Sequence, residues 1–310
     1  MARGVGAVLA ACAIAAAPLI TGCSGDPAPA AETRSPSVSA SPGPPSPSPS
    51  PTPPPKPKKL DRKGLTRALD DYLDDRVSGA SLVMVDRTTG VTYRYRAQHE
   101  YVTASVVKVD ILSTLLLQNQ RAHRGLTSAQ RSDADIMIRY SDNKAADRLY
   151  THVGGAAGVD AANRKLKLRH THAVDGKCID LLCWSLTRTT ADDQIRLLRS
   201  LIQGGGPLTA KNRAYVLGLM GRVIKEQSWG VRAAARPGDE VANKNGWMTR
   251  EADGDRWVIN SIGRVRGNGH DFVIAVFTEH NPSEGYGITT AEHMVRLAAK
   301  RFRDTTPWFN

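Results

Sequence analysis

The stretch Ser105-Val106-Val107-Lys108 opens an apolar run that continues to Gln118. The length and composition of this run predict a buried helix. Within a helix, a spacing of three places Ser105 and Lys108 on one face, in contact with each other. The positive end of the helix dipole lies near the Ser105 hydroxyl and favours its alkoxide. Lys108 could take the hydroxyl proton only if burial or a second cation lowered its pKa.

Two polar triplets further along the chain join Ser105 and Lys108 in a set of three short motifs. Residues 141–143 are Ser-Asp-Asn and fall between two predicted helices, while residues 244–246 are Lys-Asn-Gly and fall at the end of a predicted strand. Taken singly, residues 141–143 also fit an ordinary capping turn, residues 244–246 a hairpin turn, and Lys108 a solvated lysine on a helix. Their order, and their placement on a helix start, an interhelical loop and a strand, make the set specific. Asp142 itself is expected to be an acceptor that holds its loop.

The periodicity of the rest of the chain predicts an α+β fold. The order of elements is helix, two strands, many helices, three strands and a final helix. This order predicts an antiparallel five-stranded sheet flanked by the terminal helices, with an all-helical subdomain inserted between the second and third strands. The predicted helices are 65–73, 106–118, 127–140, 143–152, 158–166, 190–203, 209–225 and 288–302, and the strands are 80–85, 91–95, 240–244, 256–264 and 271–279.

Together these residues resemble the motif set of class A β-lactamases and the related penicillin-binding transpeptidases. The resemblance extends over residues 60–302. It implies that Ser105 is the acylated nucleophile and that Lys108 takes its proton directly or through water. It also implies that Ser141 relays a proton to the leaving nitrogen, with Lys244 supplying positive charge beside it.

The resemblance also implies how a substrate is held. Backbone N–H groups of Ser105 and Trp247 would form an oxyanion hole. Lys244 and, on the next strand, Arg256 would face a substrate carboxylate. The substrate-binding residues are therefore expected to be Asn143, Asn245, Gly246, Trp247 and Arg256. The substrate would be a β-lactam or a small peptide or ester resembling a cell-wall stem peptide, and we expect a monomer without metal or organic cofactor.

The sequence departs from the family pattern at three places. Asn245 stands where the family usually has Thr or Ser, which puts carboxylate binding in doubt. The stretch from Ser105 to Ser141 is shorter than in class A enzymes. No glutamate occurs between Glu100 and Glu226. Class A enzymes use a glutamate in that region to activate the deacylating water, so hydrolysis of an acyl-enzyme is expected to be slow or altered.

These departures leave several hypotheses open. Asp175 lies at roughly the right place to replace the missing base, or it is a surface loop aspartate. The leading hypothesis is a serine acyl-transfer enzyme, acting as a weak β-lactamase or as a peptidase or esterase on wall material. The alternative is a catalytically inert binding lipoprotein of the cell wall that keeps the fold. Asn245 and the missing glutamate favour this alternative. It is opposed by the intact motif residues Ser105, Lys108, Ser141, Asn143 and Lys244.

The N-terminal segment predicts export and lipid attachment. The apolar run Val5–Ile20 is short for a spanning helix and leads to Cys23, in a sequence that resembles a lipobox. An ordinary secretory cleavage site is the alternative. Residues 24–59 are rich in Pro and Ser and predict a disordered tether. We therefore expect a signal peptide at 1–23, a lipid such as palmitate on Cys23, and a hydrolase domain at 60–310 on the extracytoplasmic face of a bacterial membrane.

Charge and cysteine content narrow the partners. The net charge of +12 favours anionic wall polymers or lipid headgroups. A nucleic-acid partner is not expected, because no basic motif has interleaved aromatic residues. Cys178 and Cys183 predict a local disulfide in an exported domain, with two buried thiols as the alternative. The nearby His170 and His172 do not have a recognised zinc-ligand spacing.

Overall fold

The computed structural model describes residues 58–178 and 180–305. These residues belong to the unit Pro54–Asn310, and the unit Met1–Pro53 lies outside them. The predicted signal peptide, Cys23 and the tether up to residue 57 therefore lie outside the described residues. None of the helices in the described part has the length and apolar character that a bilayer crossing needs.

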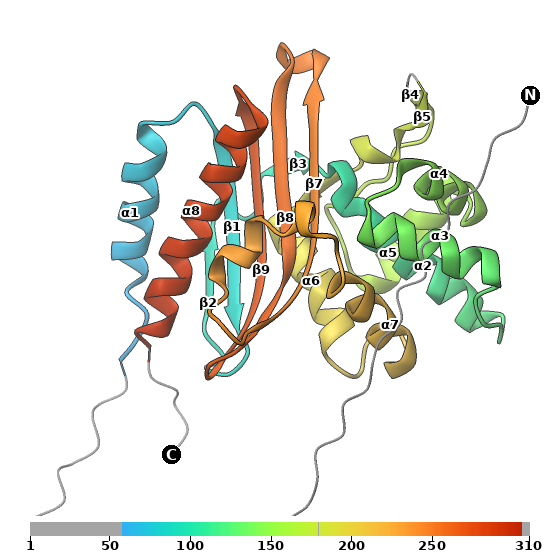
Figure 1. Ribbon diagram of the computed structural model, residues 1–310, viewed down its shortest axis with the longest axis horizontal. Coiled ribbons are helices and arrows are strands. Elements are labelled where there is room, and N and C mark those ends of the chain that lie inside the picture. The colour runs from blue at the N-terminus through green and yellow to red at the C-terminus, as the bar shows by residue number, and fades with distance from the viewer. Residues whose placement is uncertain (1–57, 179, 306–310) are drawn as a thin grey trace, which may run out of the picture. The chain divides into compact units, whose positions relative to one another are not determined.

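The centre of the domain is the predicted antiparallel five-stranded sheet. Its strand order is β2-β1-β9-β8-β7, so β1 from the start of the domain pairs with β9 from its end. β9 is buried along almost its whole length, because helices cover both faces of the sheet (Figure 1). The strands are β1 (Gly79–Asp86), β2 (Thr92–Tyr95), β7 (Glu240–Arg250), β8 (Arg256–Gly267) and β9 (His270–Asn281).

The two terminal helices cover one face of this sheet (Figure 1). α1 (Arg62–Asp74) buries the predicted stripe of Leu65, Leu69 and Leu73. α8 (Glu284–Arg303) contacts α1, and apolar residues of both helices share one core with residues of β1 and β9. Removing these apolar stripes from water holds the helices on the sheet.

The predicted all-helical subdomain covers the other face. Its central helix, α2 (Lys108–Arg121), is buried along most of its length. A tight 3-10 turn, η1 (Ala104–Val107), precedes α2 and carries Ser105, so the start of the predicted helix is wound more tightly than expected. The other helices on this side are α3 (Ser128–Arg139), α4 (Asn143–His152), α5 (Gly155–Leu166), α6 (Ala191–Ile202) and α7 (Ala210–Met220).

The two largest differences from the predicted element boundaries are at the ends of β7 and α7. β7 continues to Arg250, so residues 244–246 lie inside the strand and not at its end; pairing with β8 along the whole strand explains the extension. The helix predicted at 209–225 ends at Met220. The chain then leaves the helical path, and Ile224 N donates to the carbonyl oxygen of Arg139 at 3.1 Å.

A loop between α5 and α6, called here the 172–188 loop, carries the disulfide. Its ends meet at an antiparallel bridge between His172 and Arg188. β3 (Glu100–Val102) pairs beside this bridge with β6 (Arg188–Thr190). At the tip, β4 (Lys177–Cys178) pairs with β5 (Leu181–Leu182), and Cys178 is disulfide-bonded to Cys183. The 3-10 turn η2 (Cys183–Leu186) follows directly.

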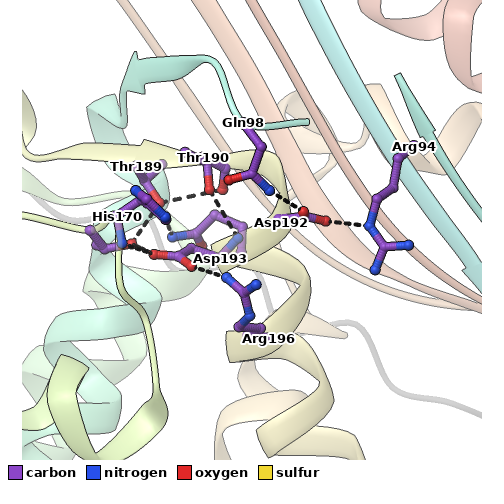
Figure 2. A network of polar contacts seen from close by, with 10 residues as sticks. Arg94, Gln98, His170, Thr189, Thr190, Asp192, Asp193 and Arg196 are labelled. Carbon is purple, nitrogen blue, oxygen red and sulfur yellow. Dashed lines mark hydrogen bonds and ion pairs between the residues drawn. The ribbon is translucent and has the colours of Figure 1, made fainter. Parts of the chain in front are cut away.

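A buried polar network fixes the base of this loop, and Figure 2 shows its contacts. Asp193 is fully buried, and its Oδ2 accepts hydrogen bonds from His170 N at 2.7 Å and Thr171 Oγ1 at 2.9 Å. Arg196 forms an ion pair with the other oxygen of Asp193. We call this set the Asp193 network; its members are Arg94, Gln98, His170, Thr171, Thr189, Asp192, Asp193 and Arg196.

Candidate active site

Lys108 connects the first two predicted motifs. It is the first residue of α2, and its side chain is fully buried. Its Nζ lies 2.5 Å from the Ser141 carbonyl oxygen, 2.7 Å from Asn143 Oδ1 and 3.2 Å from Ser141 Oγ. The spacing along α2 predicted contact with Ser105, but these hydrogen bonds go to the turn between α3 and α4.

Ser141 occupies that turn in a left-handed backbone conformation, with φ of 60°. Such a conformation is unfavourable for a residue with a Cβ and persists only where the surroundings enforce it. The next residue, Asp142, caps α4 by accepting from Ala145 N at 2.6 Å. This contact confirms the expectation that Asp142 holds its loop. The cap and Lys108 together fix where the Ser141 hydroxyl points.

Lys244 brings the third motif to the same hydroxyl. It is fully buried on β7, and its Nζ lies 2.9 Å from Ser141 Oγ. The remaining contacts of Nζ are Asn245 O at 2.9 Å and Gln227 Oε1 at 3.3 Å. The Ser141 hydroxyl therefore lies between two ammonium groups from distant parts of the chain. We call Lys108, Ser141, Asn143, Gln227 and Lys244 the Ser141 cluster.

The Ser105 backbone lies against Gly246 of β7. A Cβ built on Gly246 would lie 2.7 Å from the Thr103 carbonyl oxygen and 2.8 Å from the Ser105 backbone nitrogen. Only glycine therefore allows β7 to lie this close to η1. The Ser105 side chain is half-buried, and among the described residues none hydrogen-bonds its hydroxyl. Its neighbour Ala104 also has a left-handed backbone, with φ of 46°.

Burial changes the protonation of both lysines. Loss of solvent lowers the pKa of Lys108 to about 7, although the charges of Asp142 and Asp147 oppose this shift. Burial, together with the charge of Lys108, lowers the pKa of Lys244 well below its usual value. Within residues 58–178 and 180–305, neither lysine forms an ion pair with a carboxylate. A lysine with a pKa near neutrality can accept a proton, as the proposed role of Lys108 requires.

Trp184 and Asp147 belong to this site and were not predicted. The buried indole of Trp184, on η2, lies with its ring centre 4.8 Å from Lys108 Nζ. Asp147 Oδ1 accepts from Trp184 Nε1 at 2.7 Å and from Leu182 N at 3.0 Å. Asp147 could have been suspected from its position one helical turn after Asn143. Nothing in the sequence indicates that Trp184 would reach Lys108, since this depends on how the 172–188 loop folds.

Two predicted site residues do not join the cluster. Asp175 Oδ1 accepts from Ala156 N at 2.7 Å, near the start of α5. Among the described residues it has no hydrogen bond to Ser105 or to the cluster. Arg256 pairs with Arg250 at the tip of the β7–β8 hairpin, whereas Asn260 pairs with Gly246. Arg256 is therefore four residues, roughly 13 Å at the usual strand rise, beyond the level of Gly246.

Asn245 is present at the predicted position, but its side chain is engaged within the protein. It is fully buried, and its Nδ2 donates to the carbonyl oxygens of Gln227 at 2.9 Å and Trp229 at 3.3 Å. Trp247 is half-buried, and its ring meets that of Trp229 edge-on at 5.8 Å. Gln227, which also contacts Lys244, gave no signal in the sequence. The described residues contain no group of three or more His, Cys, Asp or Glu side chains that could hold a metal ion.

Comparison with known proteins gives matches of two kinds. A family model described as "Beta-lactamase enzyme family" matches residues 120–302, a range that includes Ser141 and Lys244 and begins after Ser105. A protein of Mycobacterium bovis and Mycobacterium tuberculosis that carries the name "Putative lipoprotein LppW" is 29% identical over 192 residues. The matched part is 60% of this chain and 58% of that relative.

Solved structures with the same fold are more distant in sequence. A class A β-lactamase from Mycobacterium abscessus is 22% identical, covers 77% of this chain and 99% of its own, and superposes with a TM-score of 0.66. A point mutant of PBP-A, solved as an acyl-enzyme complex with penicillin G, is 18% identical, covers 78% and 97%, and has the same TM-score of 0.66. At this level of identity the similarity shows the fold.

Proposed function

This chain belongs to the β-lactamase enzyme family, and we propose that it is a lipid-anchored serine hydrolase that forms an acyl-enzyme at Ser105 and deacylates slowly. The acyl donor is a β-lactam or a peptide or ester of the D-Ala type. The observation that carries this proposal is the Ser141 hydroxyl, held 3.2 Å from Lys108 Nζ and 2.9 Å from Lys244 Nζ. The acyl-enzyme that PBP-A forms with penicillin G on the same fold supports the same chemistry here.

The geometry supports a role for each group in acylation. Lys108, with a pKa of about 7, is partly neutral near pH 7 and takes the Ser105 proton directly or through water. The Ser105 oxygen attacks the acyl carbon at the tip of η1. In this proposal the backbone N–H groups of Ser105 and Trp247 stabilise the resulting oxyanion. Ser141 then donates its proton to the leaving group and is resupplied by the lysines.

The indole of Trp184, which lies beside Lys108, supports slow deacylation. The 172–188 loop presents the indole of Trp184 to the Lys108 ammonium, with ring centre and nitrogen 4.8 Å apart. An indole cannot remove a proton from water, and no glutamate occurs in the chain between Glu100 and Glu226. Asp175, the proposed substitute base, would have to release Ala156 N before it could activate water.

The proposal includes export and membrane attachment through Cys23. The relative from Mycobacterium is named a lipoprotein, and the Cys23 context has the form of a lipobox. The enzyme would then act at the extracytoplasmic face of the membrane. Replacing Cys23 with Ala should release the chain from membranes in a fractionation experiment, and persistent membrane retention would contradict lipid attachment.

Covalent labelling tests the catalytic part. The full chain, in detergent, is incubated with a fluorescent penicillin and separately with an activated phenyl ester, next to Ser105→Ala. Intact-protein mass spectrometry should show an acyl adduct with at least one reagent, and this adduct should be absent from Ser105→Ala. Rapid turnover of a chromogenic cephalosporin would contradict slow deacylation. If turnover occurs, Asp175→Asn tests whether Asp175 is the base.

A second candidate function is an inert binding lipoprotein of the cell wall. The Asn245 side chain favours this candidate, because its amide is hydrogen-bonded within the protein. The family usually has a hydroxyl at that position, which binds the substrate. A chain that binds wall fragments but forms no adduct at Ser105 with any activated acyl donor would support this candidate and exclude the enzyme.

A further inference from the structure

A second cavity lies between α2, α3 and α7, away from the Ser141 cluster. The three helices contact one another, and the cavity between them has a volume of about 510 Å³. Its lining includes Asn119, eleven residues after Lys108 on α2, which is roughly 16 Å along the axis at the usual helical rise. We call it the α2–α7 pocket. Its volume is in the range of sites that bind a small molecule.

Amide side chains at the end of α2 fix the walls of this pocket. Gln120 Oε1 accepts from Thr209 N at 2.9 Å and from Asn212 Nδ2 at 3.1 Å, which ties the start of α7 to α2. Asn119 Nδ2 donates to Gln130 Oε1 at 3.1 Å, which ties α3 to α2. The pocket therefore has its shape before a ligand arrives, and binding costs less conformational entropy.

One part of the lining is apolar. Leu116 is buried, and Leu126 and Tyr215 are half-buried. These side chains come from α2, from the turn before α3 and from α7, and together they can cover an apolar part of a ligand. Removing such surface from water favours binding.

The charged part of the lining is entirely basic. Residues 111–132 and 194–225, which supply every residue of the lining, contain no Asp or Glu. A Cβ built on Gly125 would lie 4.0 Å from Arg131 Nη2, so this guanidinium reaches the turn that follows α2. The basic lining residues are His123, Arg124, Arg131 and Lys211.

The carboxylates nearest in sequence to Arg131 are paired elsewhere. Asp133 forms an ion pair with Arg148 at 2.5 Å, and Asp135 forms one with Arg139 at 2.9 Å. Across residues 58–178 and 180–305, no ion pair involves any of the basic side chains that line the pocket. Their positive charge is therefore available to an anionic ligand.

We propose that the α2–α7 pocket binds an anionic phospholipid, with the phosphate on the basic side chains and an acyl chain on the apolar ones. Guanidinium and ammonium groups are the usual protein ligands of phosphate. A phosphate without an apolar part would leave Leu116 and Tyr215 uncovered, and a neutral lipid would leave the cations without a partner. This binding goes beyond acyl transfer, and it does not depend on an acyl-enzyme at Ser105.

Photolabelling tests the proposal. The full chain, in an uncharged detergent, is irradiated with a dihexanoyl phosphatidylglycerol analogue that carries a diazirine in one acyl chain. Peptide mapping by mass spectrometry should place the adduct within residues 116–126 or 211–215. The matching phosphatidylcholine analogue, whose choline cancels the phosphate charge, should label these peptides at least about tenfold less. Equal labelling by the two lipids, or no adduct in these peptides, would overturn the proposal.

Competition separates a lipid site from a site for free phosphate. Unlabelled dihexanoyl phosphatidylglycerol should displace the analogue at a concentration at least about tenfold lower than glycerol phosphate does, because only the lipid covers the apolar side chains. Equal competition by glycerol phosphate would show a phosphate site only and would exclude the amphipathic ligand.

A double variant tests the basic side chains. Arg131→Gln with Lys211→Gln should lower labelling of the pocket at least about fivefold, because two phosphate-binding cations are lost. Arg164→Gln with Lys167→Gln makes the same charge change at exposed positions near the end of α5 and should label like wild type. Urea unfolding should be the same for both variants, which separates lost binding from lost folding. Undiminished labelling of the first variant would contradict the role of the cations.

Discussion

The Ser141 cluster and the Asp193 network both bury charged side chains, but they compensate the charge in opposite ways. In the Asp193 network each carboxylate has a cation: Arg196 pairs with Asp193, and Arg94 pairs with Asp192 (Figure 2). Backbone and hydroxyl donors fill the other positions of Asp193. This is the arrangement expected of a network whose role is to hold structure.

The Ser141 cluster has two buried lysines and, in the described part of the chain, no carboxylate paired with either. Their charge is reduced through a lowered pKa in place of an ion pair. A buried amine that readily gives up its proton costs stability and gains reactivity. A buried polar cluster that holds structure therefore pairs its charges, whereas one that takes part in chemistry lowers the pKa of its charged groups. The following experiments test whether the two clusters differ in this way.

Replacing Lys108 with Met is expected to have the largest effect. The rate of Ser105 acylation should fall by about 10³-fold, because the variant has no group to take the serine proton. The free energy of unfolding should stay the same or rise, since a desolvated amine is removed. Adduct formation and urea unfolding measure the two quantities. Lys300→Met, at an exposed position of α8, is the control, and acylation by Lys108→Met within tenfold of wild type would contradict its role.

Replacing Asp193 with Ala should affect stability. It leaves His170 N, Thr171 Oγ1 and Arg196 without their partner, and the free energy of unfolding should fall by about 3 kcal/mol. Urea unfolding measures this loss. Asp135→Ala, which removes a half-exposed ion pair with Arg139, should cost less than about 1 kcal/mol. Similar losses in the two variants would show that the Asp193 network is not the structural element inferred here.

Removing the disulfide tests the loop that runs between the two clusters. The 172–188 loop starts at the Asp193 network and carries Trp184 to the Ser141 cluster. Cys178→Ser with Cys183→Ser should lower the free energy of unfolding by about 2 kcal/mol, the value expected for such a short closed loop. A reducing agent should reproduce the loss in wild type and have no effect on the double variant. Identical unfolding curves with and without the bond would rule out a contribution from it.

The change of the acylation rate with pH should be the smallest of these effects. Lys108 is a base only when neutral, and its pKa is about 7. The acylation rate of the activated phenyl ester should therefore rise about tenfold per pH unit below pH 7 and level off above it. Rates between pH 5.5 and 8.5 would show this profile. A rate that falls with rising pH would require Lys108 to act as a cation and would contradict its role as the base.

Much of the fold could be predicted from local patterns. The leucine stripe of α1 and the positions of most helices follow from side-chain periodicity, which each segment carries by itself. Errors arose where long-range contacts decide a boundary. Pairing with β8 extends β7 beyond Gly246, and the contact between Ile224 and the Arg139 carbonyl ends α7 early.

The sequence by itself determined the motif residues, their order and the absence of a glutamate between Glu100 and Glu226. Only the tertiary structure decided that the Ser141 hydroxyl lies between two lysines, that Trp184 meets Lys108, and that Asn245 is turned inward. The physical reason is that spacing along one element fixes only its own faces. Contacts between distant segments, and the burial that lowers a lysine pKa, depend on how those elements pack.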